Sequence, residues 1–128
     1  MSGLKGEMRR MTTLSTGPIE NNPVLGVRPA QLVTVKIVNR AAAEVLVINI
    51  LGYFLDTTRT LYVSEVVEIA PDEVVTRDYF ANLDAFEFLF TGDDLGEKAG
   101  ISVWGKQADG QLVDAHRVVT HEILNDEL

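Results

Sequence analysis

The chain has 128 residues, no cysteine and a formal net charge of −8 at pH 7. This length suits one domain with one hydrophobic core, and the lack of cysteine excludes disulfides, thiol nucleophiles and thiolate metal sites. The acidic charge argues against nucleic-acid binding, which requires a basic surface. No window offers the roughly eighteen uninterrupted apolar residues of a membrane span. The N-terminus also lacks the apolar stretch of a secretory signal peptide. We therefore expect neither insertion into a membrane nor secretion by way of a signal peptide.

Residues 1–31 differ in composition from the rest of the chain. They hold four of the ten glycines and three of the four prolines, and their net charge is +2, which leaves −10 for the remainder. No alternation of apolar residues runs through them, so we predict an extended N-terminal connector arm over 1–31 and a folded domain over 32–128. A frayed terminus is the alternative interpretation.

We expect this arm to dock on a neighbouring copy of the chain. Its basic charge complements the acidic domain, and its prolines lower the conformational entropy that is lost on docking. The predicted inter-subunit residues of the arm are Leu4, Met8, Met11, Pro23, Val24, Leu25, Val27, Arg28 and Pro29.

From residue 32 onward, apolar residues recur at every second position, as is typical of half-buried strands. The alternation begins at Val33–Ile37, and Phe86, Phe88 and Phe90 place three rings on one face, which we expect to supply much of the core. The predicted strands are 33–37, 44–51, 61–69, 74–80, 86–90, 101–106 and 112–124. This pattern predicts an all-β protein with a single antiparallel β-sandwich or jelly-roll domain.

The strand predicted at 44–51 is apolar on both of its faces. Such a strand is covered on both sides, either centrally within a domain or by a neighbouring subunit. Gly52 then predicts a bend at which the chain leaves the sheet. The predicted trimer or core interface on this strand is Val45, Val47, Asn49 and Leu51.

Residues suited to catalysis or metal binding are few. His116 and His121 are the only histidines, and their odd spacing places them on opposite faces of one strand, so they cannot share a metal ion. Asp114 shares a face with His116, but two ligands are too few for a structural zinc site. The acidic loop 92–97 lacks the residue order of a calcium-binding loop. We therefore expect no metal, no cofactor and no enzymatic activity.

Paired carboxylates occur in predicted turns, where they are solvated, whereas acid catalysis needs a carboxyl group held in a cleft. Trp104 with Tyr53, Tyr62 and Tyr79 could line a sugar-binding groove. Aromatic residues of this kind are more often part of a core or an interface.

Several segments together resemble one known family. They are Thr58–Val63, Ala70–Phe90, Ile101–Lys106 and Gly110–Arg117. The chain, over about residues 22–124 and including Asn22–Pro29, resembles the subunit of the thin F-type endospore appendages, fibres that project from the exosporium of spore-forming bacteria.

The resemblance implies a β-sandwich that forms trimers, and trimers that stack head to tail into a fibre through N-terminal connectors. Its partners would be other copies of the chain, with an anchor protein and a tip protein at the ends of the fibre, and its location would be the spore surface. The alternative function is a trimeric head domain that binds a carbohydrate or a receptor.

Overall fold

The computed structural model describes residues 11–116 and 119–121, so Leu4 and Met8 of the predicted arm lie outside the described part. No helix in this part is long and apolar enough to cross a membrane.

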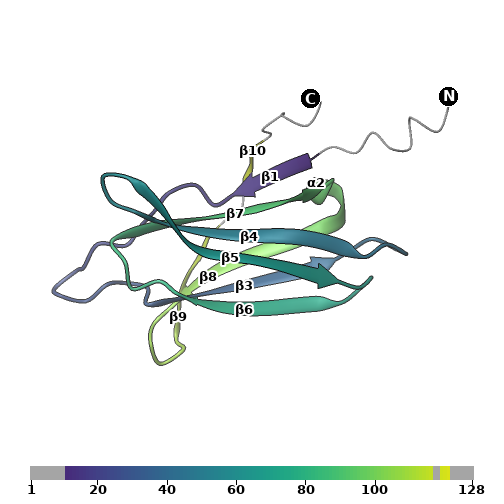
Figure 1. Ribbon diagram of the computed structural model, residues 1–128. Coiled ribbons are helices and arrows are strands. Elements are labelled where there is room, and N and C mark those ends of the chain that lie inside the picture. The colour runs from purple at the N-terminus through teal and green to yellow at the C-terminus, as the bar shows by residue number, and fades with distance from the viewer. Residues whose placement is uncertain (1–10, 117–118, 122–128) are drawn as a thin grey trace.

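Two antiparallel sheets form the body of the protein (Figure 1). The strands of the six-stranded sheet are, in spatial order, β10 (Val119–His121), β1 (Met11–Ser15), β7 (Ala85–Asp93), β4 (Leu46–Leu55) and β5 (Arg59–Ile69), with β2 (Ile19–Glu20) also paired to β7. The four-stranded sheet has the order β6 (Val74–Phe80), β3 (Leu32–Asn39), β8 (Ala99–Lys106) and β9 (Leu112–His116). A single turn of helix, α2 (Leu95–Lys98), joins β7 to β8. The predicted all-β sandwich is confirmed.

The core lies between the two sheets and consists of the alternating inward side chains of both. The largest of the fully buried side chains are those of Phe86, Phe88 and Phe90 in β7. Strand β3 supplies Val33, Val35 and Ile37 from the other sheet. The predicted role of the three phenylalanines is therefore confirmed.

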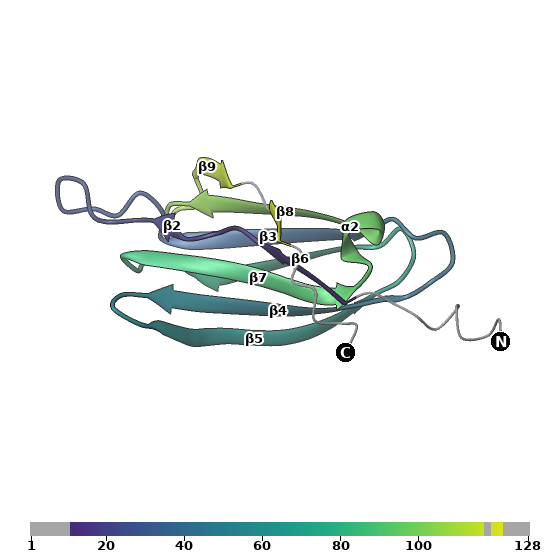
Figure 2. The same ribbon diagram turned by 90° about the horizontal axis from the view of Figure 1, so that it is seen from above.

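The described part of the predicted arm belongs to the body. Strands β1 and β2 both pair with β7, and Leu14, Ile19 and Ala30 are buried. The prediction of an arm that is separate up to residue 31 is wrong for residues 11–21 and 30–31, which pair or pack with the sandwich, whereas residues 22–29 protrude from it (Figure 2). The two strands of the arm have five and two residues, which are too short to show an alternation that marks a strand in the sequence.

Two further predictions about strand ends are wrong. Strand β4 continues through Gly52 to Leu55, with a bulge in its pairing with β5 between Gly52 and Tyr53, so the chain does not leave the sheet there. The predicted closing strand 112–124 is divided, because β9 pairs with β8 in one sheet and β10 with β1 in the other. Pairing partners of this kind are set by the packing of the whole domain and not by the local pattern.

Polar contacts join the edge strands β5 and β6 across the two sheets. Arg77 Nε donates a hydrogen bond to Glu65 Oε2 at 2.7 Å, and the Tyr79 hydroxyl donates to Glu65 Oε1 at 2.6 Å. Both hydrogen bonds lower the pKa of Glu65, and the one from Tyr79 has the larger effect. At the same edge the Tyr62 hydroxyl donates to the Phe80 carbonyl, and burial raises the pKa of Tyr62 to about 12.

Gly52→Ala tests the packing of β4 on β7. An added Cβ would lie 2.8 Å from Cε2 of Phe88 and 2.9 Å from Cβ of Val63, so we expect the free energy of unfolding to fall by about 1–3 kcal/mol. Gly96→Ala is the control, because nothing lies within 4 Å of its added Cβ. It should be neutral or stabilising by about 0.5–1 kcal/mol. Urea unfolding measures both, and an equal effect of the two substitutions would contradict the close contact.

Glu65→Gln tests the edge contact through its pH dependence. Because the folded state lowers the pKa of Glu65, its stabilisation is present above the ordinary glutamate pKa of about 4.3 and is lost as the pH falls through the folded-state pKa. We expect the substitution to lower the free energy of unfolding at pH 7 and to have less effect at pH 3. Glu68→Gln, on the outer face of the same strand, is the matched control. If it changed the free energy of unfolding with the same pH dependence as Glu65→Gln, the stabilising contact of Glu65 would be refuted.

Candidate assembly surfaces

The outer face of the six-stranded sheet carries a group of exposed valines. Val45, Val47 and Val66 are 58%, 50% and 62% exposed, respectively. In the register of β4 and β5, Val47 lies opposite Glu68 and Asn49 lies opposite Val66. A solvated outer face of an antiparallel sheet is normally polar, so this apolar group is unusual for a surface that water covers.

The predicted interface residues of β4 share this outer face. Val47, Asn49 and Leu51 of β4, and Val45 directly before it, occupy alternate positions, while Leu46, Ile48 and Ile50 between them are buried in the core. The chain therefore covers one face of β4, and the valines stay exposed on the other. Coverage of this second face by a neighbouring subunit stays a prediction. Burying one such side chain contributes about 1.5–3 kcal/mol.

A second apolar surface is formed by residues 22–29, which we call the tip loop. Figure 2 shows it protruding at one end of the sandwich, with α2 at the opposite end. At its tip, Val24 and Val27 form a bridge with backbone hydrogen bonds in both directions. Leu25 and Gly26 between them have φ values of 54° and 84°. Positive φ at both central residues is the geometry of a type I′ hairpin turn.

Side chains of the body hold the tip loop at its base. Asn21 is buried, and its amide Nδ2 donates to the carbonyls of Ala30, Ala81 and Leu83 at 2.7–3.0 Å. Its Oδ1 accepts a hydrogen bond from the Ala30 N–H at 2.9 Å. Arg28 adds an ion pair with Asp84 at 2.7 Å. These contacts fix the direction in which the loop leaves the sandwich.

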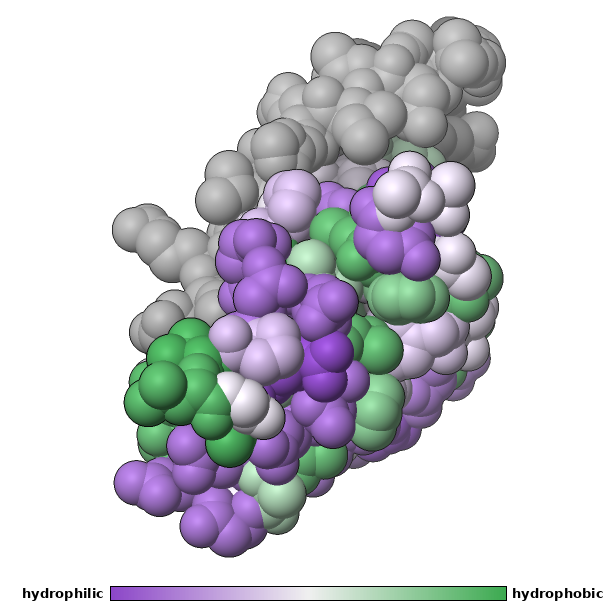
Figure 3. Space-filling view, turned by 90° about the vertical axis from the view of Figure 1, so that its left-hand side faces the viewer, coloured by the Kyte–Doolittle hydropathy of each residue, from purple (hydrophilic) through white to green (hydrophobic). Residues whose placement is uncertain are grey.

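The tip loop brings together most residues of the predicted inter-subunit arm. Val24, Leu25 and Val27 are 63%, 99% and 55% exposed, and Figure 3, which looks onto this end, shows hydrophobic residues gathered over the protruding loop. Pro23, Arg28 and Pro29 belong to the same loop. Met11 does not join them, because it lies at the start of β1 opposite Asp93.

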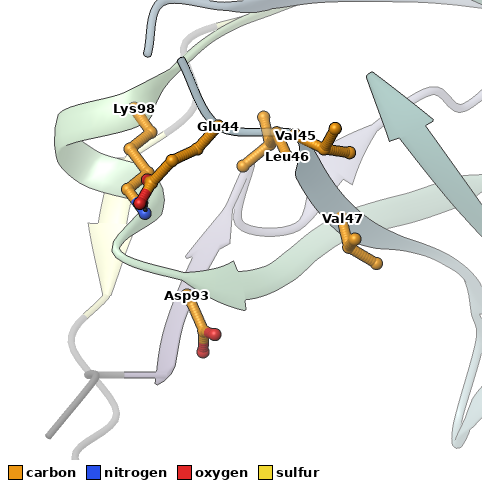
Figure 4. A pocket seen from close by; sticks show the side chains of 6 residues that line it. All are labelled: Glu44, Val45, Leu46, Val47, Asp93 and Lys98. Carbon is orange, nitrogen blue, oxygen red and sulfur yellow. Dashed lines mark ion pairs between the residues drawn. The ribbon is translucent and has the colours of Figure 1, made fainter. Parts of the chain in front are cut away.

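A hollow of about 260 Å³ lies at the other end of the sandwich, and we call it the end hollow. Its lining residues are Glu44, Val45, Leu46, Val47, Asp93 and Lys98. Figure 4 shows Lys98 reaching toward Glu44, and the two side chains form an ion pair at 2.8 Å. An added Cβ on Gly92 would lie 2.8 Å from the Val47 carbonyl oxygen, so glycine permits the close approach of β7 to β4 beside the hollow.

No pattern in the sequence indicated the end hollow. Glu44 and Lys98 are far apart in the chain, and they meet because β4 starts and α2 lies at the same end of the sandwich. The apolar parity of Val45 and Val47 was the only signal in the sequence that concerned this site.

The four aromatic residues considered for one sugar-binding groove lie in separate places. Tyr62 and Tyr79 pack on the buried ring of Phe88, at centroid distances of 6.2 and 5.5 Å. Tyr53 contacts the guanidinium of Arg59, whereas Trp104 lies with Thr34 and Asp78 along a shallow groove of the other sheet. These four residues therefore do not line one groove, and Tyr62 and Tyr79 instead pack on the core, as aromatic residues of this kind more often do.

The two histidines also lie on different strands of different sheets, since His116 ends β9 and His121 ends β10. The assumption that one strand carries both is wrong. The acidic loop 92–97 contains the end of β7 and most of α2. Among the side chains that the structure describes, those of residues 11–113, no group of three or more histidine and carboxylate side chains is placed to hold a metal ion.

Comparisons with known proteins add little to this picture. No protein-family model matches the chain, and no curated protein matches it. Among solved structures, the chain is similar to the crystal structure of Thermotoga maritima 1070, with 15% sequence identity and a TM-score of 0.48. The match covers 91% of this chain and 95% of that chain.

Asn21→Ala tests the attachment of the tip loop. The substitution leaves one N–H and three carbonyl groups without the amide that they contact. An unsatisfied buried polar group costs about 1–3 kcal/mol, so we expect the free energy of unfolding to fall by about 3 kcal/mol. Asn22→Ala is the matched control, since its exposed amide donates to the exposed side chain of Glu20 at 3.0 Å. It should change the free energy of unfolding by no more than about 0.5 kcal/mol. Thermal unfolding measures both variants, and equal destabilisation by the two would contradict the role of the buried Asn21 in attaching the loop.

Proposed function

We propose that this chain is a structural subunit that associates with copies of itself into a non-covalent fibre, and that it is not an enzyme. The observation that carries the proposal is the exposed valine group on the outer face of the six-stranded sheet, where Val45, Val47 and Val66 are each at least half exposed. Apolar groups of this kind on a surface mark sites of protein association.

The lateral contact uses the central part of this face. Asn49, Leu51 and Val66 lie on the two adjacent strands β4 and β5, and burying them against a neighbouring body removes apolar surface from water. Three bodies in contact through this face form the trimer that the sequence resemblance implies. Asn49 supplies a polar group within the contact, which favours one register over others.

The longitudinal contact joins successive trimers. A contact between two different surfaces of identical subunits repeats without closing, and it therefore builds an open fibre. The tip loop is one apolar surface available for it. From the resemblance stated above, we expect this fibre to be an appendage of the exosporium on the spore surface, with an anchor protein at its base, a tip protein at its free end and no cofactor.

Val66→Asp tests the lateral contact. A buried, unpaired carboxylate is strongly disfavoured, so we expect assembly to require at least a tenfold higher concentration, equivalent to about 1.4 kcal/mol. Light scattering after size-exclusion chromatography measures the mass, and negative-stain electron microscopy shows the form. We expect wild-type fibres with a regular axial repeat and smaller species from the variant.

Val74→Asp is the matched control. Val74 is a valine 52% exposed on the outer face of the other sheet, so the same substitution should leave assembly at the wild-type concentration. Circular dichroism checks that both variants are folded. A wild-type chain that stays monomeric at millimolar concentration would sink the proposed function, and normal fibres from Val66→Asp would remove this face from it.

A further inference from the structure

Three basic side chains have no carboxylate partner among the described residues. Side chains are described for residues 11–113, and four of the seven basic ones form ion pairs, namely those of Arg28, Arg59, Arg77 and Lys98. The other three are Lys36, Arg40 and Lys106, and all of them line the outer face of the four-stranded sheet. In a chain of net charge −8, cations gathered on one face without carboxylate partners indicate a site for an anionic ligand.

The three cations line one continuous groove, which we call the basic groove. It consists of two hollows of about 440 and 270 Å³ that share Lys36. The groove runs along β8 from Gly100 to Lys106, six residues apart, which is about 20 Å at the usual rise of a strand. Asp78 is the one carboxylate among its described lining residues, so the lining has a net charge of +2. A groove of this length suits a chain-like ligand with several negative charges.

Two of the cations are held over the groove while their charge stays unneutralised. An added Cβ on Gly100 would lie 2.5 Å from Nη2 of Arg40, so the guanidinium lies directly over the backbone of β8. The Lys36 ammonium donates a hydrogen bond to the hydroxyl of Thr76 at 3.1 Å. Because that hydroxyl is neutral, the ammonium can still pair with a carboxylate of a ligand.

Trp104 supplies an aromatic face in the same groove. On β3, Thr34 lies opposite Trp104 on one side and opposite Asp78 on the other. The buried Thr34 donates its hydroxyl proton to Asp78 Oδ1, which positions this carboxylate. A pyranose ring has an apolar C–H face that packs on an aromatic ring, and it has hydroxyl groups that a carboxylate accepts as hydrogen-bond donors. The groove therefore offers partners for both parts of a sugar, next to cations.

We propose that the basic groove binds an acidic glycan, a chain of sugars that carry carboxylate groups. Trp104 packs on one sugar ring, Asp78 accepts hydrogen bonds from its hydroxyls, and the three cations pair with carboxylates along the chain. This binding activity is additional to the proposed assembly and does not rest on it. The groove lies on the outer face of the four-stranded sheet, whereas the proposed lateral contact uses the outer face of the other sheet (Figure 2).

Two other anionic polymers suit the groove less well. Single-stranded nucleic acid stacks successive bases on several aromatic rings, but Trp104 is the one aromatic residue among the described residues that line the groove. An extended acidic peptide binds a sheet by adding a strand to a free edge. Strands β3 and β8, which run beneath the groove, are each paired on both sides, so their backbone groups are already used.

Titration with tetragalacturonate tests the binding directly. Trp104 is the one tryptophan of the chain, so its fluorescence reports on the groove in the full-length protein, and isothermal titration calorimetry measures the same binding. We expect saturable binding that weakens as salt is added. The methyl ester of the same oligosaccharide lacks the negative charges and should bind at least about tenfold more weakly. Equal binding of the two, or no binding of tetragalacturonate at millimolar concentration by either method, would overturn the proposal.

Arg40→Gln and Lys36→Gln test the cations of the groove. Each removes one charge that pairs with a ligand carboxylate, so each should weaken the binding of tetragalacturonate at least about tenfold. Arg59→Gln is the matched control, because it removes the same charge from an exposed side chain of β5 in the other sheet. It should leave the affinity within about twofold. Equal weakening by the control would show that net charge decides the affinity, and the groove would lose its role.

Trp104→Leu tests the sugar-packing face, with binding followed by calorimetry and folding by circular dichroism. Leucine keeps an apolar side chain over the sheet but removes the aromatic plane, so the affinity for tetragalacturonate should fall at least about tenfold. An unchanged affinity would refute the packing of a sugar on this ring. Single-stranded DNA or polyglutamate that binds the wild-type protein as tightly as tetragalacturonate would overturn the choice of a glycan.

Discussion

Burial of Phe88 is the contact on which the arrangement of both sheets depends. Its ring packs on Tyr62 of β5, on Phe86 of its own strand and on Tyr79 of β6 in the other sheet. Strand β7, which carries this ring, pairs with β1, β2 and β4. Gly52 of β4 supplies the space that the ring occupies. Loss of this packing would loosen the strands that hold both proposed assembly surfaces.

The body presents apolar surface in two forms that differ physically. The outer face of β4 and β5 extends along two paired strands, which suits the proposed lateral contact between similar faces. The tip loop is narrow and protrudes, and buried hydrogen bonds at Asn21 hold its base. The tip loop and the end hollow lie at opposite ends of the sandwich (Figure 2). Both kinds of surface are available to the proposed fibre.

The acidic charge of the chain and its apolar surfaces act in opposite senses. A net charge of −8 keeps separate copies apart and opposes unspecific association. The exposed valines and Leu25 favour association, but only where shape and local charge agree. The proposed assembly should therefore depend on ionic strength, because salt screens the repulsion between copies.

The sequence by itself determined the all-β fold, most strand positions and the phenylalanine core, because period-two alternation follows directly from strand geometry. It also showed that β4 is apolar on both faces, which identified the valines later found exposed. Only the tertiary structure decided that residues 11–21 join the sheet, that the last strand divides between two sheets, and that Glu44 and Lys98 meet beside a hollow. Those features depend on contacts between residues distant in the chain, and no local pattern encodes which distant strands become neighbours.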